Sequence, residues 1–193
     1  MSYITQKKIA AAFKTLMVEE PFSKISVTMI MTHAQIRRQT FYDYFPDKFA
    51  LLAWLYDQEI GEQIDDNLNY VDWPQILEAL FLYFDQNRQF YQNALSIKGQ
   101  NSFEGYFMQH IRQLINHIIK QMITVHQLKL STNYQKFLLN YLSGALVAFT
   151  SNWLQSRHPE SVKQVTTELK ITLTDTINGL LLRTGHLSTD LTN

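Results

Sequence analysis

Apolar residues recur at three- and four-residue intervals along almost the whole chain, and this periodicity constrains the fold more than any other feature. The 193 residues include only 6 glycines and 4 prolines, the residue types that most often interrupt helices. No convincing strand pattern appears between the helical stretches. We therefore predict an all-α fold with helices over residues 3–19, 27–34, 37–44, 48–68, 73–87, 103–125, 132–155 and 159–183.

Several residues indicate where these helices begin or end. Pro21 ends the first helix because proline cannot continue the hydrogen-bond ladder. Ser26 and Asp47 are good N-caps for the helices that follow them. Asp72 precedes Trp-Pro-Gln, a typical helix start, and Pro159 is expected in the first turn of the last helix.

Composition excludes several classes of protein. There is no cysteine, so neither a disulfide framework nor a thiolate metal site is expected. No window approaches the roughly 20 apolar residues that span a bilayer, and we expect a soluble, cytoplasmic protein without a membrane partner. The net charge is zero, yet residues 1–50 contain seven Lys and Arg side chains against four Asp and Glu. This local excess of positive charge is a modest indication of a nucleic-acid partner.

The strongest candidate for such a surface lies in two short predicted helices joined by a tight turn, following a longer first helix. This order is typical of a helix-turn-helix, in which the second short helix enters the DNA major groove. Its N-terminal residues are Arg37, Arg38, Gln39 and Thr40. Arginine can pair with guanine and glutamine with adenine, while threonine can reach a phosphate or a thymine methyl group. The alternative for the two arginines is a solvated helix face.

The aromatic residues that follow divide between the core and the surface. On a helical wheel Phe41 and Phe45 lie together and suit the core. Tyr42 and Tyr44 lie to either side, where a hydroxyl group can reach a phosphate, although half-buried packing is the alternative for both. Lys48 begins the next helix, where a cation beside free amide groups favours phosphate.

The segment "SVTMIMTHAQIRRQTFYDYFPDKFALL" resembles the DNA-binding segment of TetR-family transcriptional regulators, and the likeness covers about residues 5–55. The resemblance implies a three-helix DNA-binding domain, here residues 1–48, and a larger helical domain for effector sensing and dimerisation, residues 49–193. It also implies double-stranded operator DNA as the partner and adds Thr28 to the phosphate contacts. Neither a cofactor nor a metal is expected.

Three positions depart from the family pattern. Gln35 stands where the turn usually has glycine, Arg37 where a serine usually caps the recognition helix, and Gln39 where a small residue is usual. A left-handed backbone at Gln35 would cost roughly 1 kcal/mol, and the lost cap costs about as much. We interpret the two added long polar side chains as a sign of an altered operator sequence.

The helix predicted over residues 132–155 has apolar residues on more than one side and small residues at its middle, so it needs more than one packing partner. A homodimer is the common solution, and a central core helix within the monomer is the alternative. The interface residues we expect are Tyr141, Gly144, Ala145, Ala148, Ile171, Thr174, Ile177, Asn178 and Leu181.

An effector pocket is expected among the helices near residues 73–125. Its candidate lining is Tyr83, Tyr91, Tyr106, Phe107 and His110. Each of these is also a plausible core residue, and a partner protein is the alternative to a small-molecule ligand.

The segment "RRQTFYDYFPDKFALLAWLY", together with Trp153, resembles a Firmicutes branch of the family that includes regulators of dihydroxyacetone-kinase operons. This resemblance implies an activator that uses a kinase-like protein as co-activator. The alternative is a small-molecule-responsive repressor of a neighbouring transporter or metabolic gene.

An enzyme is the least favoured reading. His110 and His117 share a helical face but stand two turns apart, about 10 Å of rise, which is too far for one metal ion. No H-E-x-x-H, glycine-rich phosphate loop or nucleophile elbow appears. The other rival, a helical protein-binding module without DNA binding, is disfavoured by the adjacent arginines.

Overall fold

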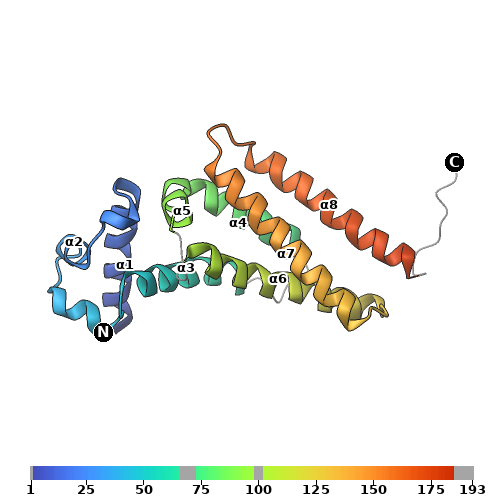
Figure 1. Cartoon of the computed structure of the whole chain (residues 1–193), viewed down its shortest axis with the longest axis horizontal. Coiled ribbons are helices and arrows are strands. Elements are labelled where there is room, and N and C mark those ends of the chain that lie inside the picture. The colour runs from blue at the N-terminus through green and yellow to red at the C-terminus, as the bar shows by residue number, and fades with distance from the viewer. Residues whose placement is uncertain (1, 66–72, 98–101, 185–193) are drawn as a thin grey trace. The chain divides into compact units, whose positions relative to one another are not determined.

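The computed structural model describes residues 2–65, 73–97 and 102–184, and within these ranges every regular element is a helix (Figure 1). The all-α prediction is therefore confirmed. The described residues form two compact units. Unit 1 comprises residues 1–71 and 82–106, and unit 2 comprises residues 72–81 and 107–193. The division falls within two helices, because α4 and α6 each contribute residues to both units.

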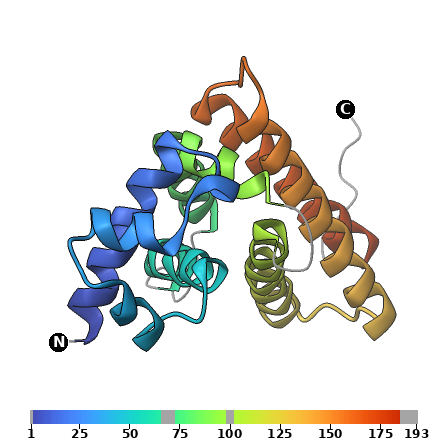
Figure 2. The same ribbon diagram turned by 60° about the vertical axis from the view of Figure 1, so that its left-hand side comes forward.

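Unit 1 begins with a helix-turn-helix head. Its elements are α1 (Ser2–Glu19), the short 3-10 helix η1 (Phe22–Lys24), α2 (Val27–His33), the 3-10 helix η2 (Arg38–Asp43) and α3 (Lys48–Asp65). Figure 2 shows α2 packed against α1. The buried residues Phe13, Ile30 and Phe41 form part of the core between these helices.

The rest of unit 1 comes from later in the chain. It includes the C-terminal residues of α4 (Trp73–Gln86), all of α5 (Arg88–Leu95) and the first residues of α6 (Phe103–His126). Tyr91 of α5 is fully buried, and its ring lies 4.7 Å from that of Phe84 and 5.6 Å from that of Phe103. Phe103 also packs 5.0 Å from the ring of Tyr56 on α3, so the head shares one core with segments far from it in sequence.

Unit 2 contains the start of α4, most of α6, α7 (Thr132–Gln155) and α8 (Val162–Arg183). Helices α7 and α8 run side by side in opposite directions (Figure 1). Trp153 on α7 packs 5.2 Å from the ring of Phe81 on α4, and its indole donates a hydrogen bond of 2.9 Å to the Glu160 carbonyl oxygen. This contact fixes the connection between the last two helices.

The predicted capping residues are largely confirmed. The Ser26 hydroxyl accepts from the Met29 amide at 3.2 Å, and one Asp47 carboxylate oxygen accepts from the Phe49 and Ala50 amides at 2.9 and 2.8 Å. The first helix ends before Pro21, as predicted. The predicted cap at residue 72 and the predicted helix end near residue 68 lie outside the described residues.

Three elements differ from the sequence prediction. The helix predicted over 37–44 is a 3-10 helix. The last helix begins at Val162, because the Ser161 hydroxyl caps it and leaves Pro159 in the preceding connection, not in the first turn. Helix α5 was not predicted as a separate element. It is separated from α4 at Asn87, whose side-chain amide donates to the Tyr83 carbonyl oxygen at 2.9 Å, a local hydrogen bond that competes with helix continuation.

Candidate DNA-binding surface

A turn that requires a left-handed residue sets the angle between α2 and η2. Gln35 has a φ of 55°, and the Gln35 and Ile36 amides each donate at 3.0 Å to the carbonyl oxygens of Thr32 and Met31. The left-handed backbone predicted at this position is therefore confirmed. Because a non-glycine residue adopts it at a cost of about 1 kcal/mol, the surrounding hydrogen bonds and packing must hold it.

The recognition element η2 begins without a side-chain cap. Arg37 occupies the N-cap position with extended backbone angles, φ −61° and ψ 137°, and makes no capping hydrogen bond through its side chain. The loss of the serine cap predicted from the sequence is confirmed. The Thr40 amide donates to the Arg37 carbonyl oxygen at 3.1 Å, and the Tyr44 amide donates to that of Phe41 at 3.0 Å. This three-residue spacing is typical of the tighter 3-10 helix.

Two phenylalanines attach η2 to the core, as predicted. Phe41 is 0% exposed and Phe45 is 3% exposed, and their ring centres lie 5.7 Å apart. Phe45 also packs 5.6 Å from Trp54 on α3. Because Phe41 on η2 and Phe45 just after it face the core, the polar residues that precede Phe41 are directed to the surface.

The predicted base-contacting residues lie together at the start of η2. Arg37, Arg38 and Gln39 are exposed, and Thr40 is half-buried. One short stretch of backbone therefore presents two guanidinium groups and one side-chain amide. All three can donate hydrogen bonds to base edges or phosphates.

The predicted phosphate contacts surround this stretch. Thr28 on α2 is exposed, and Tyr42 retains 53% of its accessible surface. Tyr44 is half-buried, so part of its ring packs within the head. These three positions are compatible with the predicted roles, which remain untested.

Lys48 has a structural role that sequence reasoning missed. Its ammonium group donates to the carbonyl oxygens of Phe22 at 2.7 Å and Ile25 at 2.8 Å, and burial lowers the pKa of this group from its ordinary value. An ammonium group has three N–H donors. If Lys48 contacts a phosphate, its ammonium group therefore donates to the phosphate and to these two carbonyl groups together. These carbonyl groups belong to the first residue of η1 and to the residue that follows it, and this short 3-10 helix gave no sequence signal.

The residues predicted to line an effector pocket are distributed over both units. Tyr91 and Phe107 are buried, whereas Tyr83, Tyr106 and His110 are half-buried. Tyr83 and Tyr91 pack against each other in unit 1, with ring centres 6.1 Å apart. The predicted pocket stays a prediction.

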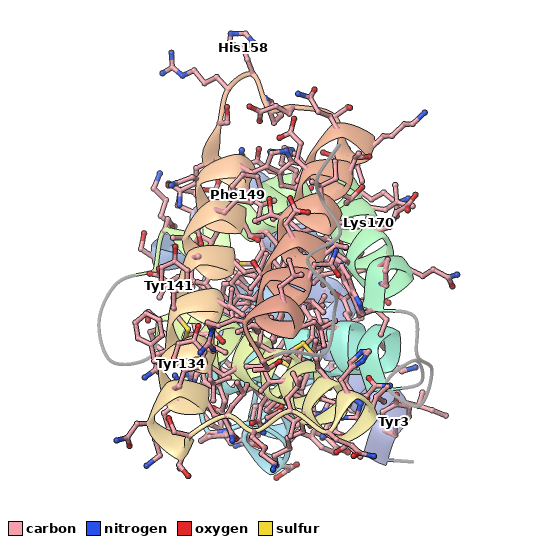
Figure 3. The ribbon with its side chains drawn as sticks, turned by 90° about the vertical axis from the view of Figure 1, so that its right-hand side faces the viewer. Tyr3, Tyr134, Tyr141, Phe149, His158 and Lys170 are labelled. Atoms are coloured by element: carbon pink, nitrogen blue, oxygen red, sulfur yellow. The ribbon has the colours of Figure 1, made fainter. Side chains whose placement is uncertain are left out.

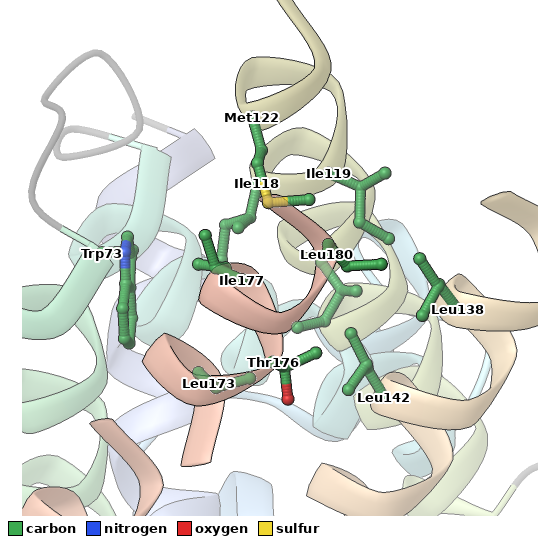
Figure 4. A pocket seen from close by; sticks show the side chains of 11 residues that line it. Trp73, Ile118, Ile119, Met122, Leu138, Leu142, Leu173, Thr176, Ile177 and Leu180 are labelled. Atoms are coloured by element: carbon green, nitrogen blue, oxygen red, sulfur yellow. The ribbon is translucent and has the colours of Figure 1, made fainter. Parts of the chain in front are cut away.

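Two adjoining cavities with other linings lie among the described residues of unit 2. An apolar cavity of about 30 Å³ lies between α4, α6, α7 and α8, and includes Trp73 and Met122 in its wall (Figure 4). A more open groove of about 310 Å³ lies between α6, α7 and α8. Ile115, Leu142 and Leu173 contribute to both.

Most of the predicted dimer residues lie at the surface of unit 2. Tyr141 and Ile171 are 63% and 55% exposed, and the exposed set continues with Ala145, Ala148, Thr174 and Asn178. Gly144 and Ile177 are half-buried, and Leu181 is buried. Figure 3 shows Tyr134, Tyr141 and Phe149 along α7. The rings of Tyr134, Phe137 and Tyr141 stack in series, with centres 6.0 and 5.8 Å apart.

The left-handed turn at Gln35 between α2 and η2, with Phe41 buried behind it, gives the head the arrangement of a helix-turn-helix. A family described as "Transcriptional regulator C-terminal region" (TetR_C_8) matches residues 71–175. The chain is 35% identical over 176 residues to the HTH-type dhaKLM operon transcriptional activator DhaS of Lactococcus lactis subsp. lactis (strain IL1403), covering 88% of this chain and 93% of that protein. This chain belongs to the TetR family of transcriptional regulators.

Other similarities agree with this assignment. The chain is 26% identical over 135 residues to the transposon Tn10 TetC protein of Escherichia coli, covering 65% of this chain and 68% of that one. A solved structure of a dihydroxyacetone kinase operon activator DhaS matches with a TM-score of 0.77 and 34% identity, over 92% of this chain and 98% of that chain. A putative fatty acid metabolism regulator of Clostridium perfringens, 19% identical, shares the fold with a TM-score of 0.61 over 87% of this chain and 97% of its own.

None of the helices in the described ranges is both long and apolar enough to span a membrane.

Proposed function

We propose that this protein binds operator DNA as a homodimer and activates transcription of a dihydroxyacetone-kinase operon. The observation that carries DNA binding is the exposure of Arg37, Arg38 and Gln39 at the start of η2, while Phe41 behind them is fully buried. A fixed element with free donors at its N-terminal end suits insertion into the major groove. We propose that the protein acts in the cytoplasm and has no catalytic activity.

The proposed contacts divide by chemistry. Arg37, Arg38, Gln39 and Thr40 contact bases or nearby backbone, with arginine pairing to guanine and glutamine to adenine. Thr28, Tyr42, Tyr44 and Lys48 contact phosphates, which position the head without reading sequence. We place the DNA-binding domain at residues 1–48 and the effector and dimerisation domain at residues 49–193.

The proposed dimer pairs the α7 and α8 surfaces of two copies. Support comes from the exposure of Tyr141 on α7 and Ile171 on α8. It also comes from the exposed small residues Ala145 and Ala148 on α7, because small residues allow a second helix to approach closely. Two heads related by a two-fold axis would bind half-sites about one helical turn apart.

The proposed target follows from the likeness to DhaS, which is an activator of the dhaKLM operon and is matched over 93% of its length. A kinase-like co-activator protein is the proposed partner under this reading.

The second candidate is a small-molecule-responsive repressor of a neighbouring transporter or metabolic gene. The groove of about 310 Å³ in unit 2 favours it, since ligand pockets generally begin at about this volume.

A binding and transcription experiment separates these possibilities. Fluorescence anisotropy with duplexes from upstream of this gene, its neighbours and a dihydroxyacetone-kinase operon should find a site bound with steep salt dependence. A reporter fused to that site should then be transcribed more strongly when the protein and the kinase-like partner are both present. Lower transcription, relieved by a metabolite, supports the repressor. Equal binding to all duplexes contradicts operator recognition.

A further inference from the structure

Three side chains from three helices form a closed hydrogen-bonded triangle within unit 1. The Lys14 ammonium group on α1 lies 2.6 Å from a carboxylate oxygen of Glu59 on α3 and donates to the Tyr83 hydroxyl oxygen on α4 at 3.1 Å. The Tyr83 hydroxyl in turn donates to the second carboxylate oxygen of Glu59. Each member therefore contacts the other two.

The triangle lies in partly dehydrated surroundings, which strengthens its hydrogen bonds. The Lys14 and Glu59 side chains are only 26% and 21% exposed. The ammonium group also lies 5.4 Å from the centre of the Tyr83 ring and 5.8 Å from that of Phe90, within the range of a cation–π contact. Burial raises the pKa of the Tyr83 hydroxyl, and its hydrogen bond to Glu59 raises it further, so this hydroxyl remains a donor at neutral pH.

A second contact holds the C-terminal end of α1, one turn beyond Lys14. The side-chain amide of Asn93 on α5 donates to the Met17 carbonyl oxygen at 2.5 Å and to that of Glu20 at 3.3 Å. Carbonyl groups in the last turn of a helix have no partner within it, so Asn93 supplies one from outside.

Both contacts are made by residues far from the head in sequence. Tyr83 and Asn93 lie within the matched C-terminal region, residues 71–175, yet they belong to unit 1 together with the head. Helix α1 is also the helix against which α2 packs, and through Phe13 it contacts the Phe22 ring at 6.3 Å. A shift of α1 would therefore move the recognition element.

We propose that Lys14, Glu59, Tyr83 and Asn93 are positioning residues for operator binding, which fix α1 without touching DNA. This inference rests on the proposed DNA-binding function. Binding sites need their contacting groups held to within about 0.5 Å, so a loosened α1 weakens DNA affinity in a molecule that remains folded.

The test compares operator affinity with folding in the full-length protein. Tyr83→Phe removes one hydroxyl group without changing charge, and Lys14→Met removes the ammonium group while keeping most of the chain length. We expect each to weaken operator binding by about five- to tenfold, because only part of the free energy of a charge-assisted hydrogen bond is transmitted from α1 to the DNA contacts. Lys14→Arg keeps the charge and the donors, and should restore most of the affinity.

Two further readouts separate positioning from plain stability. Affinity is measured at least 15 °C below each variant's midpoint of thermal unfolding, where a purely structural role leaves it unchanged. A double-mutant cycle with Lys14→Met and Glu59→Gln should also give a coupling in operator binding, because both groups act through one contact. Asn93→Ala tests the second contact and gives an independent answer if Lys14→Met does not fold.

The chain offers a matched control in the Lys170–Glu78 ion pair of unit 2, whose Nζ–O distance is 2.8 Å. Lys170→Met also removes an interhelical ion pair, but outside unit 1, and should leave operator affinity unchanged. If the wild type binds operator and Tyr83→Phe, Lys14→Met and Asn93→Ala bind it with the same affinity, the positioning role alone is overturned. Failure of the wild type to bind any operator would instead overturn the proposed function.

Discussion

The Lys48 ammonium group donates a 2.7 Å hydrogen bond to the Phe22 carbonyl oxygen and lies 4.2 Å from the centre of the ring of the same residue. A charge at the start of α3 thus closes the head against the segment that precedes α2. The Ile25 carbonyl oxygen, at 2.8 Å, completes the contact.

This contact predicts that Lys48→Met destabilises the head even without DNA. Hydrogen bonds from a charged donor contribute about 1.5–3 kcal/mol when dehydrated, and partial exposure reduces this, so we expect a loss of about 1 kcal/mol. Urea unfolding followed by circular dichroism measures it. Lys24→Met, at an exposed position, serves as the control. An unchanged midpoint in Lys48→Met would mean that the two carbonyl contacts contribute nothing to stability.

The left-handed turn residue predicts a stabilising substitution. Gln35→Gly should raise the free energy of unfolding by about 1 kcal/mol, because glycine adopts a φ of 55° without a Cβ clash. Gln127, with a φ of 50°, is the matched position outside the head, and Gln127→Gly should give a similar gain. Thermal unfolding of both variants checks the magnitude. A loss of stability at Gln35 would show that its side chain makes compensating interactions.

The exposed arginines predict a change in sequence preference. Arg38→Ala should reduce affinity for the preferred operator by about 1–3 kcal/mol and relax discrimination at one base position. Binding to a library of operator variants, measured at fixed salt, checks both effects. Arg157→Ala, an exposed arginine in the connection before α8, should change neither. If Arg38→Ala keeps full affinity and preference, the recognition element is misplaced.

The α7 and α8 surface predicts where the dimer can be broken. Ile171, 55% exposed on α8, should become a buried unpaired charge in the dimer when replaced by glutamate, so Ile171→Glu should be monomeric by analytical ultracentrifugation. Val125→Glu, at a position on α6 that is 66% exposed and outside the predicted interface, should remain dimeric. A dimeric Ile171→Glu protein would place the interface elsewhere.

Raised tyrosine pKa values predict a loss of stability in alkali. Burial is the main cause that raises the pKa of Tyr83 above its ordinary value of 10.0. The unfolded chain therefore releases this proton first, so the stabilisation is complete below about pH 10 and is lost as pH rises above it. Tyr83→Phe should lose less stability between pH 9 and about 11 than the wild type. Tyr42→Phe, which removes the hydroxyl group of an exposed tyrosine, is the comparison variant.

Much of the head was predictable from the sequence because its signals are local. Ser26, Asp47 and Pro21 act within three or four residues of themselves, and the glutamine at the glycine position already implied a left-handed backbone. The split between buried Phe41 and exposed Arg38 followed from helical spacing. The aromatic core and the arginine surface therefore needed no knowledge of the remaining chain.

The contacts that hold the head could not be predicted in this way. Lys14 and Tyr83 are 69 residues apart, and Asn93 reaches the Met17 carbonyl oxygen over 76 residues. No short-range pattern connects such pairs. The end of α4 near Asn87 was predicted, but α5 was missed because its eight residues give little more than two turns of helical pattern. The late start of α8 was missed because Pro159 and Ser161 are both acceptable helix starts.

The three tryptophans described above lie in three different surroundings, so each can serve as a separate intrinsic fluorescence probe. Trp54 packs against Phe45 behind the recognition element, Trp73 lines the apolar cavity, and the Trp153 indole is hydrogen-bonded to the Glu160 carbonyl oxygen beside the last helix. Three variants can be made, each keeping one tryptophan and carrying phenylalanine at the other two positions. Their emission wavelength and quenching would report separately on operator binding, ligand entry and subunit association.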